Sequence, residues 1–355
     1  MTDFSTAILN WYNHEKTSMP WRDEPDPYRI WLSEVMLQQT QIQTVIPYYL
    51  KWIKTLPTVK DTAESSEDVV LKLWEGLGYY ARARNFRLAC QMITENFDGI
   101  VPSDPIQFKQ LKGVGDYITA AVQSIAFGHP LPVIDGNVRR ITSRLLSLPH
   151  PPDQHNEEIM DFLTLHIGDT QPGDFNQGMM DLARDVCKPK VPLCTQCPVS
   201  CYCSAFSDQT IHRYPVKKEK KIRPHFRVAV GVIWKDSHIL VSKRKSNGLL
   251  GGLWEFPGGK IQNGESSPEC IQRETLEELG IHVTVGDFIK TIQHAYTHFS
   301  ISMDSYHCRF QTGEPKSIGC SDWMWIKRDE LVSLAFPKAN HKIFDKIPEV
   351  SPFEN

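Results

Sequence analysis

Four cysteines in the second half of the chain have the spacing of metal ligands. They follow a C-x6-C-x2-C-x5-C pattern and are Cys187, Cys194, Cys197 and Cys203. Four thiolates bind either a tetrahedral zinc ion or an iron–sulfur cluster, and the spacing alone does not choose between them. A chain of this length does not need disulfides for stability, so the cysteines suit a metal site in a reducing compartment. Cys201 falls outside the pattern and is expected to be a bystander.

A glycine turn at residues 111–122, LKGVGDYITAAV, precedes an amphipathic helix. Gly113 and Gly115 allow a ligand to approach the backbone closely, and the N-terminus of the helix presents free N–H groups that favour a phosphate. The turn could therefore bind a nucleic-acid backbone. Glycine turns also occur in helical hairpins for packing alone, and that alternative stays open at this point.

A third pattern lies at residues 259–281, GKIQNGESSPECIQRETLEELGI. It fits G-x5-E-x7-R-E-U-x-E-E-x-G-U, where U is aliphatic, except that Thr275 occupies the first U. Glu274, Glu277 and Glu278 share a helical face, an arrangement that collects Mg²⁺ beside a pyrophosphate. The alternative is a charged helix face stabilised by i,i+4 pairs.

The elements that must position these residues differ between the two halves. Before about residue 211 the apolar residues have a helical period, as in the segments at 28–46, 67–86, 116–127 and 156–167. From residue 225 onward the pattern alternates as in β-strands, with one clear helix at 266–280. We therefore expect a multidomain protein with an all-α domain at 1–211, a basic linker at 212–224 and an α+β domain at 225–355.

Composition sets the broad class. The chain has 355 residues, of which 41% are hydrophobic and 23% charged, so disordered, collagen-like and coiled-coil proteins are excluded. No apolar stretch is long enough to span a membrane, and the first residues resemble neither a signal nor a transit peptide. We expect a bacterial-type cytoplasmic protein associated with the nucleoid, with nuclear residence still open. The net charge of −3 does not by itself indicate a nucleic-acid partner.

A family resemblance links the glycine turn to Asp135, which lies twenty residues beyond Gly115 in VIDGNVRR. This layout resembles the helix-hairpin-helix DNA glycosylases. Further segments look like an adenine DNA glycosylase of the MutY type, and they are MPWR at 19–22, WLSEVMLQQTQ at 31–41, LWEGLGYYARARN at 73–85 and FNQGMMDLARDVC at 175–187. The resemblance implies a [4Fe-4S] cluster in the loop 187–203 and a Nudix-like C-terminal domain. It implies no cofactor consumed in the reaction.

Two carboxylates fit the chemistry of base excision. A glycosylase needs an acid to protonate the leaving base and an anion beside the sugar cation. Glu34 lies among apolar residues that would raise its pKa, although without the family resemblance a solvated residue in the first turn of a helix is the better interpretation. The resemblance implies that Glu34 is the acid and that Asp135 stabilises the sugar cation. It also implies that Asn137 helps to order the site.

Position 117 separates two branches of the superfamily. In the endonuclease III branch this position holds a nucleophilic lysine that forms a Schiff base with the sugar. Here it is Tyr117, which the resemblance places near Asp135. A tyrosine predicts a monofunctional enzyme in which water completes the reaction.

The resemblance also implies a set of DNA contacts. Base flipping leaves a gap in the stack that wedge side chains fill, and Leu37, Gln39 and Tyr79 match the wedge positions. Arg22 and the turn glycines complete the predicted DNA-binding residues of the helical half. In the C-terminal domain, HAYTHFS aligns with a β-hairpin loop that recognises 8-oxoguanine in the family. The tip of that loop carries an aromatic ring, a hydroxyl and an imidazole, which correspond here to Tyr296, Thr297 and His298.

The predicted function is the removal of adenine mispaired with 8-oxoguanine or guanine in double-stranded DNA, by a monomer without membrane contact. One alternative is an endonuclease III-like glycosylase/lyase for oxidised pyrimidines. Another is a Nudix pyrophosphohydrolase whose helical domain docks on DNA.

Overall fold

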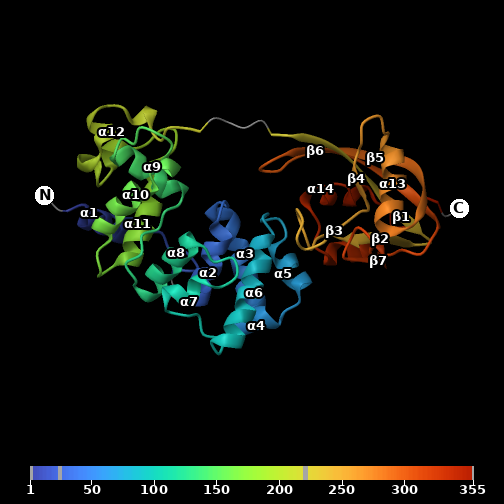
Figure 1. Ribbon diagram of the computed structural model, residues 1–355, viewed down its shortest axis with the longest axis horizontal. Helices are drawn as coiled ribbons and strands as arrows, with labels where there is room; N and C mark the ends of the chain where they lie inside the picture. Colours follow the sequence, from blue (N-terminus) through green and yellow to red (C-terminus); the bar gives the residue numbers. More distant parts are fainter. Residues whose placement is uncertain (1–2, 23–25, 219–222, 354–355) are drawn as a thin grey trace. The chain divides into compact units, whose positions relative to one another are not determined.

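The computed structural model describes residues 3–22, 26–218 and 223–353 (Figure 1). The chain divides into two compact units, one formed by Met1–Glu64 with Asn85–Lys220 and the other by Ser65–Arg84 with Lys221–Asn355. The predicted linker at 212–224 lies partly outside the described residues, because 219–222 are not among them. A short helical segment around Tyr79 therefore groups with the C-terminal residues rather than with the rest of the helical half.

The first unit is built from α-helices, as the sequence predicted. They are α1 (Phe4–Glu15), α2 (Pro27–Leu37), α3 (Ile42–Thr55), α4 (Val59–Glu64), most of α6 (Ala81–Asn96), α7 (Pro105–Lys109), α8 (Asp116–Phe127), α9 (Gly136–Leu145), α10 (Asn156–Ile167), α11 (Pro172–Asp185) and α12 (Ser204–Ser207). The predicted bounds of α8 and α10 are confirmed. Within the described ranges, no helix is long and apolar enough to cross a membrane.

Several groups of apolar side chains hold this unit together. In one of them, Phe4 of α1 packs with Phe175 and Met179 of α11. In another, the Trp31 ring of α2 lies 4.4 Å from the Phe86 ring of α6 and 5.5 Å from the Phe108 ring of α7. Burial of such large rings supplies much of the free energy that holds α2 against α6 and α7.

Two predicted helical runs are interrupted in the structure. The run at 28–46 breaks between α2 and α3, where Gln39 has a φ of +58°. The run at 67–86 breaks between α5 (Glu67–Trp74) and α6, where Tyr79 has a φ of +49°. Positive φ is uncommon for residues other than glycine and is concentrated at functional sites. In the sequence, the helical period of the apolar residues continues across both breaks, because the helices on either side of each break keep their apolar faces.

The second unit contains a seven-stranded mixed sheet, in agreement with the α+β prediction. Its strands are β1 (His225–Lys235), β2 (His238–Lys243), β3 (Trp254–Glu255), β4 (Gly258–Lys260), β5 (His282–Ala295), β6 (Ser300–Thr312) and β7 (Asp322–Ile326). The central order is β3-β2-β1-β6-β5, with β4 paired to β1 and β7 to β2. Only the β1–β6 pair is parallel among the described strand pairs, with Val230 opposite Ser305.

Alternating residues of β1 face two different cores. Val230, Val232 and Trp234 belong to one buried cluster, whereas Ala229 and Ile233 belong to the other. Helix α13 (Ser267–Leu279) covers the second face beside β1 and β5 (Figure 1). The predicted helix at 266–280 is confirmed, because its first and last residues are the two caps of α13.

Candidate functional site

Glu34 is a buried carboxyl group on α2, with 5% of its surface exposed. Burial raises the pKa of Glu34 to about 7, and the charge of Asp135 adds to the rise. The hydrogen bond from Tyr117 and the charge of Arg22 act in the opposite direction. Burial has the largest effect, as the apolar neighbours in the sequence predicted. A carboxyl group with this pKa can hold a proton at neutral pH and donate it.

Tyr117 is the hydrogen-bond partner of Glu34. It lies in the first turn of α8, directly after the glycine turn, and its hydroxyl donates to Glu34 Oε2 over 2.6 Å. Burial raises the pKa of Tyr117 well above its usual range, and the Glu34 charge raises it further. The phenol therefore stays protonated and holds the Glu34 side chain in one orientation.

Asp135 caps the N-terminus of α9. Its Oδ1 accepts the backbone N–H groups of Asn137 and Val138 over 2.9 and 2.7 Å. Its Oδ2 accepts from the side-chain amide of Asn137 over 3.0 Å. The prediction that Asp135 opens a helix is confirmed, and Asn137 does contact it. These three donors fix the carboxylate of Asp135 without contacting Glu34.

The hydrogen bonds continue from Asn137 to the cysteine loop. Arg140 donates to Asn137 Oδ1 over 3.0 Å, and through its Nε to the carbonyl oxygen of Cys187 over 2.9 Å. One guanidinium therefore connects the Asp135 end of the site to the first predicted cluster cysteine.

The glycine turn leaves the start of α8 open. Gly113 has a φ of +77°, and a Cβ there would lie 2.6 Å from Asn85 Cβ, so only glycine fits. Apart from its chain neighbours, no atom of the described residues lies within 4 Å of the position a Cβ would take on Gly115, and Gly115 has no side chain to cap α8. This backbone can be approached by a ligand from outside, as a phosphate contact requires.

The predicted DNA contacts of the helical half lie in different settings. Arg22 forms a bidentate pair with the buried Asp181, at 2.7 and 3.0 Å, so its guanidinium is held against α11. Leu37 ends α2 and is half-buried, whereas Gln39 and Tyr79 are exposed. The roles of these residues in DNA binding stay predictions.

The four predicted ligand cysteines line one cavity beside α9 and α11. Apart from Arg144 and Ser200 the cavity is lined by apolar side chains, among them Ile141, Leu182 and Val199. Burial raises the pKa of Cys197 to about 12, so a bound metal would have to displace the thiol proton. Cys201 is exposed and does not line the cavity. Among the described residues, no group of three or more His, Cys, Asp or Glu side chains is arranged to hold a metal ion.

Arg144 is a buried cation at this cavity, with 3% of its surface exposed. Its guanidinium donates to Cys187 Sγ over 3.2 Å and to the carbonyl oxygens of residues 187, 188, 189 and 214. No carboxylate pairs with it in the part of the chain that the structure describes. A buried cation normally needs an anion nearby, and four thiolates holding a cluster would supply one.

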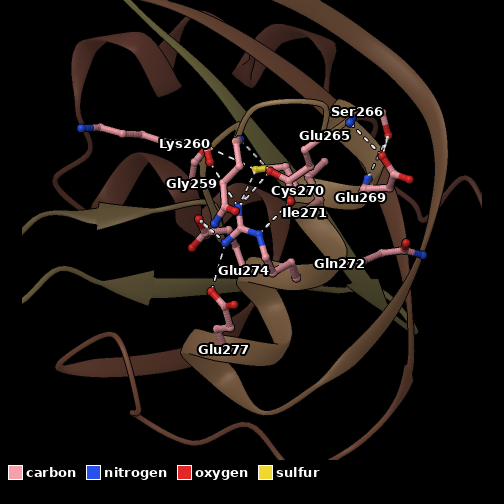
Figure 2. A network of polar contacts seen from close by, with 12 residues as sticks. Gly259, Lys260, Glu265, Ser266, Glu269, Cys270, Ile271, Gln272, Glu274 and Glu277 are labelled. Atoms are coloured by element: carbon pink, nitrogen blue, oxygen red, sulfur yellow. Dashed lines mark hydrogen bonds and ion pairs between the residues drawn. The ribbon is translucent and has the colours of Figure 1, made fainter.

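Helix α13 carries three glutamates of the Nudix-like pattern, and Figure 2 shows two of them, Glu274 and Glu277. Arg273 donates to both carboxylate oxygens of Glu265, and to Glu274 and Glu277 over 2.9 and 3.0 Å. Burial and the neighbouring acidic side chains raise the pKa of the third glutamate, Glu278, to about 7. Two of the three predicted Mg²⁺ ligands are therefore already engaged by an arginine.

The packing around these glutamates accounts for one position that fits the pattern, Gly259, and for one that departs from it, Thr275. A Cβ on Gly259 would collide with the Glu274 carboxylate, so a larger residue there would displace this side chain from its present position. Thr275, which departs from the pattern, is fully buried, and its hydroxyl donates to the carbonyl oxygen of Ile271 over 2.8 Å. The departure is tolerated because the buried hydroxyl has a partner.

The predicted lesion-recognition residues lie in the turn between β5 and β6. The Tyr296 ring stacks on Phe299 at 4.7 Å, and the Tyr296 N–H donates to the Phe299 carbonyl. Thr297 and His298 are exposed at the tip. The turn thus anchors its aromatic residue against the core, while Thr297 and His298 lie at its exposed tip, where the Thr297 hydroxyl accepts a hydrogen bond from the Tyr79 hydroxyl over 2.7 Å.

Sequence reasoning missed Arg140 and Arg144. Both lie on α9, four residues apart, so they project from the same face of the helix toward the cysteine loop. Their spacing was visible in VIDGNVRRITSR, but nothing in the sequence showed that this face meets residues 187–189.

The chain resembles known proteins along its whole length. Residues 32–164 match the HhH-GPD superfamily of base excision DNA repair proteins, and residues 229–346 match the NUDIX domain. Human adenine DNA glycosylase is 31% identical over 405 residues, covering 97% of this chain and 74% of the human protein. Adenine DNA glycosylase of Buchnera aphidicola subsp. Baizongia pistaciae is 34% identical over 266 residues, covering 73% and 75%.

A solved structure agrees for the helical part. A thermostable thymine-DNA glycosylase is 26% identical, with a TM-score of 0.53, and the match covers 58% of this chain and 95% of that one. The full-length similarity to the human enzyme, together with both domain matches, shows that the chain belongs to the adenine DNA glycosylase family.

Proposed function

We propose that this protein is a monofunctional glycosylase that removes adenine paired with 8-oxoguanine or guanine in double-stranded DNA. The observation that carries the proposal is Glu34, a buried carboxyl group whose pKa of about 7 is influenced by the charge of Asp135. Two carboxyl groups with different surroundings are what acid-assisted cleavage of a glycosidic bond requires.

Glu34 acts as the general acid in the proposed reaction. It donates its proton to N7 of adenine, which turns the base into a neutral leaving group. Tyr117 holds the Glu34 carboxyl group through its own O–H, so the side chain need not reorient when the substrate enters. Burial keeps water away from the acid and keeps its proton available near neutral pH.

Asp135 stabilises the positive charge that develops on the sugar as the bond breaks. The two backbone N–H groups and the Asn137 amide preorganise the carboxylate, so little reorganisation is needed during the reaction. Water then adds to the sugar cation, its proton passes to the Glu34 carboxylate left by the first step, and an abasic site remains. Because position 117 holds a phenol rather than an amine, no Schiff base forms there, which favours a glycosylase over the lyase alternative.

The cysteines at 187, 194, 197 and 203 would hold a [4Fe-4S] cluster. Their shared apolar cavity and the buried Arg144 beside Cys187 fit a group with four thiolate ligands. When bound, the cluster supplies structural order to the loop 187–203. Arg140 bonds to both the Cys187 carbonyl oxygen and Asn137, so an ordered loop would also hold Asn137, and through it Asp135, in position.

The C-terminal unit would recognise the base opposite adenine. Thr297 and His298 present a hydroxyl and an imidazole at an exposed turn, and such groups suit the N7 and C8 positions that distinguish 8-oxoguanine from guanine. The pairing of Arg273 with Glu274 and Glu277 gives no specific support to hydrolysis of nucleotides by this unit.

One assay tests the proposal. Duplexes that contain A:8-oxoguanine, A:G or A:T are incubated with excess protein, and abasic sites are then cleaved with alkali. We expect excision from the two mispairs, fastest opposite 8-oxoguanine, and no strand cleavage without alkali. Ala substitutions at Thr297 and His298 should reduce the preference for 8-oxoguanine. Excision of a pyrimidine, or cleavage without alkali, would refute the proposal.

A further inference from the structure

The donors that hold the Asp135 carboxylate all belong to its own helix. They come from Asn137 and Val138 at the start of α9, so they orient the carboxylate relative to α9 alone. Glu34 and Tyr117 lie on α2 and α8. The distance between the acid and the Asp135 charge therefore depends on how the start of α9 is held against α8.

A side chain of α11 holds the segment that leads into Asp135. Residues 128–135 connect α8 to α9 without forming a helix or strand in the described structure, so their buried backbone groups need hydrogen-bond partners elsewhere. Asn176 Oδ1 accepts the N–H of Val133 over 3.0 Å, and Asn176 Nδ2 donates to the carbonyl oxygen of Leu131 over 2.9 Å. One amide thus fixes the backbone on both sides of residue 132, just before Asp135.

The same amide is bonded to α8. Asn176 Nδ2 also donates to Ser124 Oγ over 2.9 Å. Asn176, Ser124 and Val133 are all buried, with at most 2% of their surface exposed. Val133 packs with Ala121 of α8, and the Tyr117 side chain packs against the same apolar cluster. Asn176 therefore joins the segment before Asp135 to the helix that carries Tyr117.

Helix α11 keeps Asn176 in a fixed place. A Cβ on Gly173 would lie 2.7 Å from the carbonyl oxygen of Ser124, and a Cβ on Gly178 would lie 2.9 Å from the Ile8 side chain of α1. The two glycines let α11 approach α8 and α1 closely. A side chain in such a densely packed interior has few alternative rotamers, so the Asn176 amide is a rigid support for the residues bonded to it.

We propose that Asn176 is a positioning residue that sets where the Asp135 carboxylate lies relative to Glu34 and Tyr117. The proposal rests on the proposed function of Asp135 as the anion beside the sugar cation. Asn176 acts through the backbone of residues 131–133, without contact to the substrate. A displacement of about 1 Å at a reacting group can cost about 100-fold in rate, even when its cause lies far from the chemistry.

The test uses the full-length protein and two DNA duplexes that differ in one charge. In the first duplex a pyrrolidine ring, positively charged at neutral pH, replaces the sugar and base of the adenine nucleotide opposite 8-oxoguanine. In the second a neutral tetrahydrofuran ring takes the same place. The ratio of the two dissociation constants, the cation preference, measures how well the Asp135 charge meets a sugar cation without any chemical step. General losses of DNA binding cancel in this ratio.

We expect Asn176→Ala to lower both the cation preference and the single-turnover rate of adenine excision by about 10- to 100-fold. In the Asp135→Asn background the same change should cause no further loss, because no charge is left to misplace. Ser124→Ala removes one anchor of the amide and should lower the cation preference by about two- to tenfold, the factor that one ordinary hydrogen bond supplies. This milder variant decides the question if Asn176→Ala does not fold.

Asn340→Ala is the matched control. Asn340 lies on α14 (Lys338–His341), is 5% exposed, and accepts the backbone N–H of Phe256 over 3.2 Å, so its loss also removes a buried amide. It belongs to the C-terminal unit. We expect this variant to lower the midpoint of thermal unfolding and to keep the wild-type cation preference. A loss of that preference here would show that any destabilisation lowers it, and would overturn the inference.

The outcomes separate this inference from the proposed function. A wild type without cation preference would overturn the proposed role of Asp135 and the inference with it. A wild-type preference that Asn176→Ala and Ser124→Ala leave unchanged would overturn the inference alone. An equal loss of rate from Asn176→Ala with and without the Asp135 charge would also overturn it, because Asn176 would then act on another part of the site.

Discussion

Replacing Glu34 with glutamine should abolish excision and stabilise the protein at alkaline pH. The amide keeps the shape of the side chain and can still accept the Tyr117 hydroxyl bond, but it has no acidic proton to transfer to the base and no charge to bury. Both effects come from the same cause, the burial that raises the pKa of Glu34 to about 7.

The sign of the stability effect follows from proton linkage. The folded protein binds the Glu34 proton more tightly than the unfolded chain, so the free energy of unfolding of the wild type falls as pH rises from about 4.5 to about 7. The full pKa difference corresponds to about 3 kcal/mol, at about 1.4 kcal/mol per unit. Part of this loss of stability in the wild type is already present at pH 5. The free energy of unfolding of the glutamine variant, relative to that of the wild type, should therefore rise by about 2 to 3 kcal/mol between pH 5 and pH 8.5.

Thermal unfolding at the two pH values measures this difference. For a unit of this size, about 1 kcal/mol shifts the midpoint by roughly 2 to 4 °C, so the gap between variant and wild type should widen by roughly 5 to 10 °C. Glu95→Gln is the matched control, because Glu95 is an exposed glutamate on α6. A midpoint difference that does not change with pH would refute the argument that Glu34 is strongly desolvated.

Three further predictions concern other parts of the site. Asp135→Asn should fold normally and bind mispaired DNA, but its single-turnover excision rate should fall by at least about 100-fold, because a preorganised charge is lost; a wild-type rate would remove Asp135 from the mechanism. Tyr117→Lys should give borohydride-trapped DNA adducts that the wild type does not give, and trapping by the wild type would contradict the monofunctional assignment. Purified protein should be brown and contain about four iron atoms. Cys197→Ala should lose iron and DNA binding, whereas Cys201→Ala should keep both. A colourless wild type with one zinc ion would contradict this prediction.

Local signals in the sequence predicted much of the fold. Helix α13 begins after Ser266, whose side chain forms a capping box with Glu269, and ends at Gly280 with a φ of +69°. Helix α8 likewise ends at Gly128 in a left-handed conformation. Such caps act over three or four residues, so their effect is visible without knowledge of the tertiary structure.

The helix breaks at Gln39 and Tyr79 were not predicted. The apolar period continues across both breaks, and at Gln39 a single left-handed residue leaves little trace in such a pattern. At Tyr79 the neighbouring Gly76 and Gly78 are left-handed as well, and these two glycines were the local signal of a break. The segment around Tyr79 also joins the C-terminal unit, although the sequence placed it inside the helical domain. Long-range contacts such as that between Glu75 and Phe336 decide this grouping, and no local pattern encodes them.

The sequence by itself determined which residue types were available for the chemistry: a carboxyl group in an apolar helix, an aspartate at a helix start, four spaced cysteines and a tyrosine in place of a lysine. The tertiary structure alone decided their partners. It brought Tyr117 to within 2.6 Å of Glu34, linked Arg140 to Cys187 and joined Tyr79 to Thr297. The physical reason is that propensity and capping act between near neighbours, whereas burial and the pKa of Glu34 depend on which distant segments pack together.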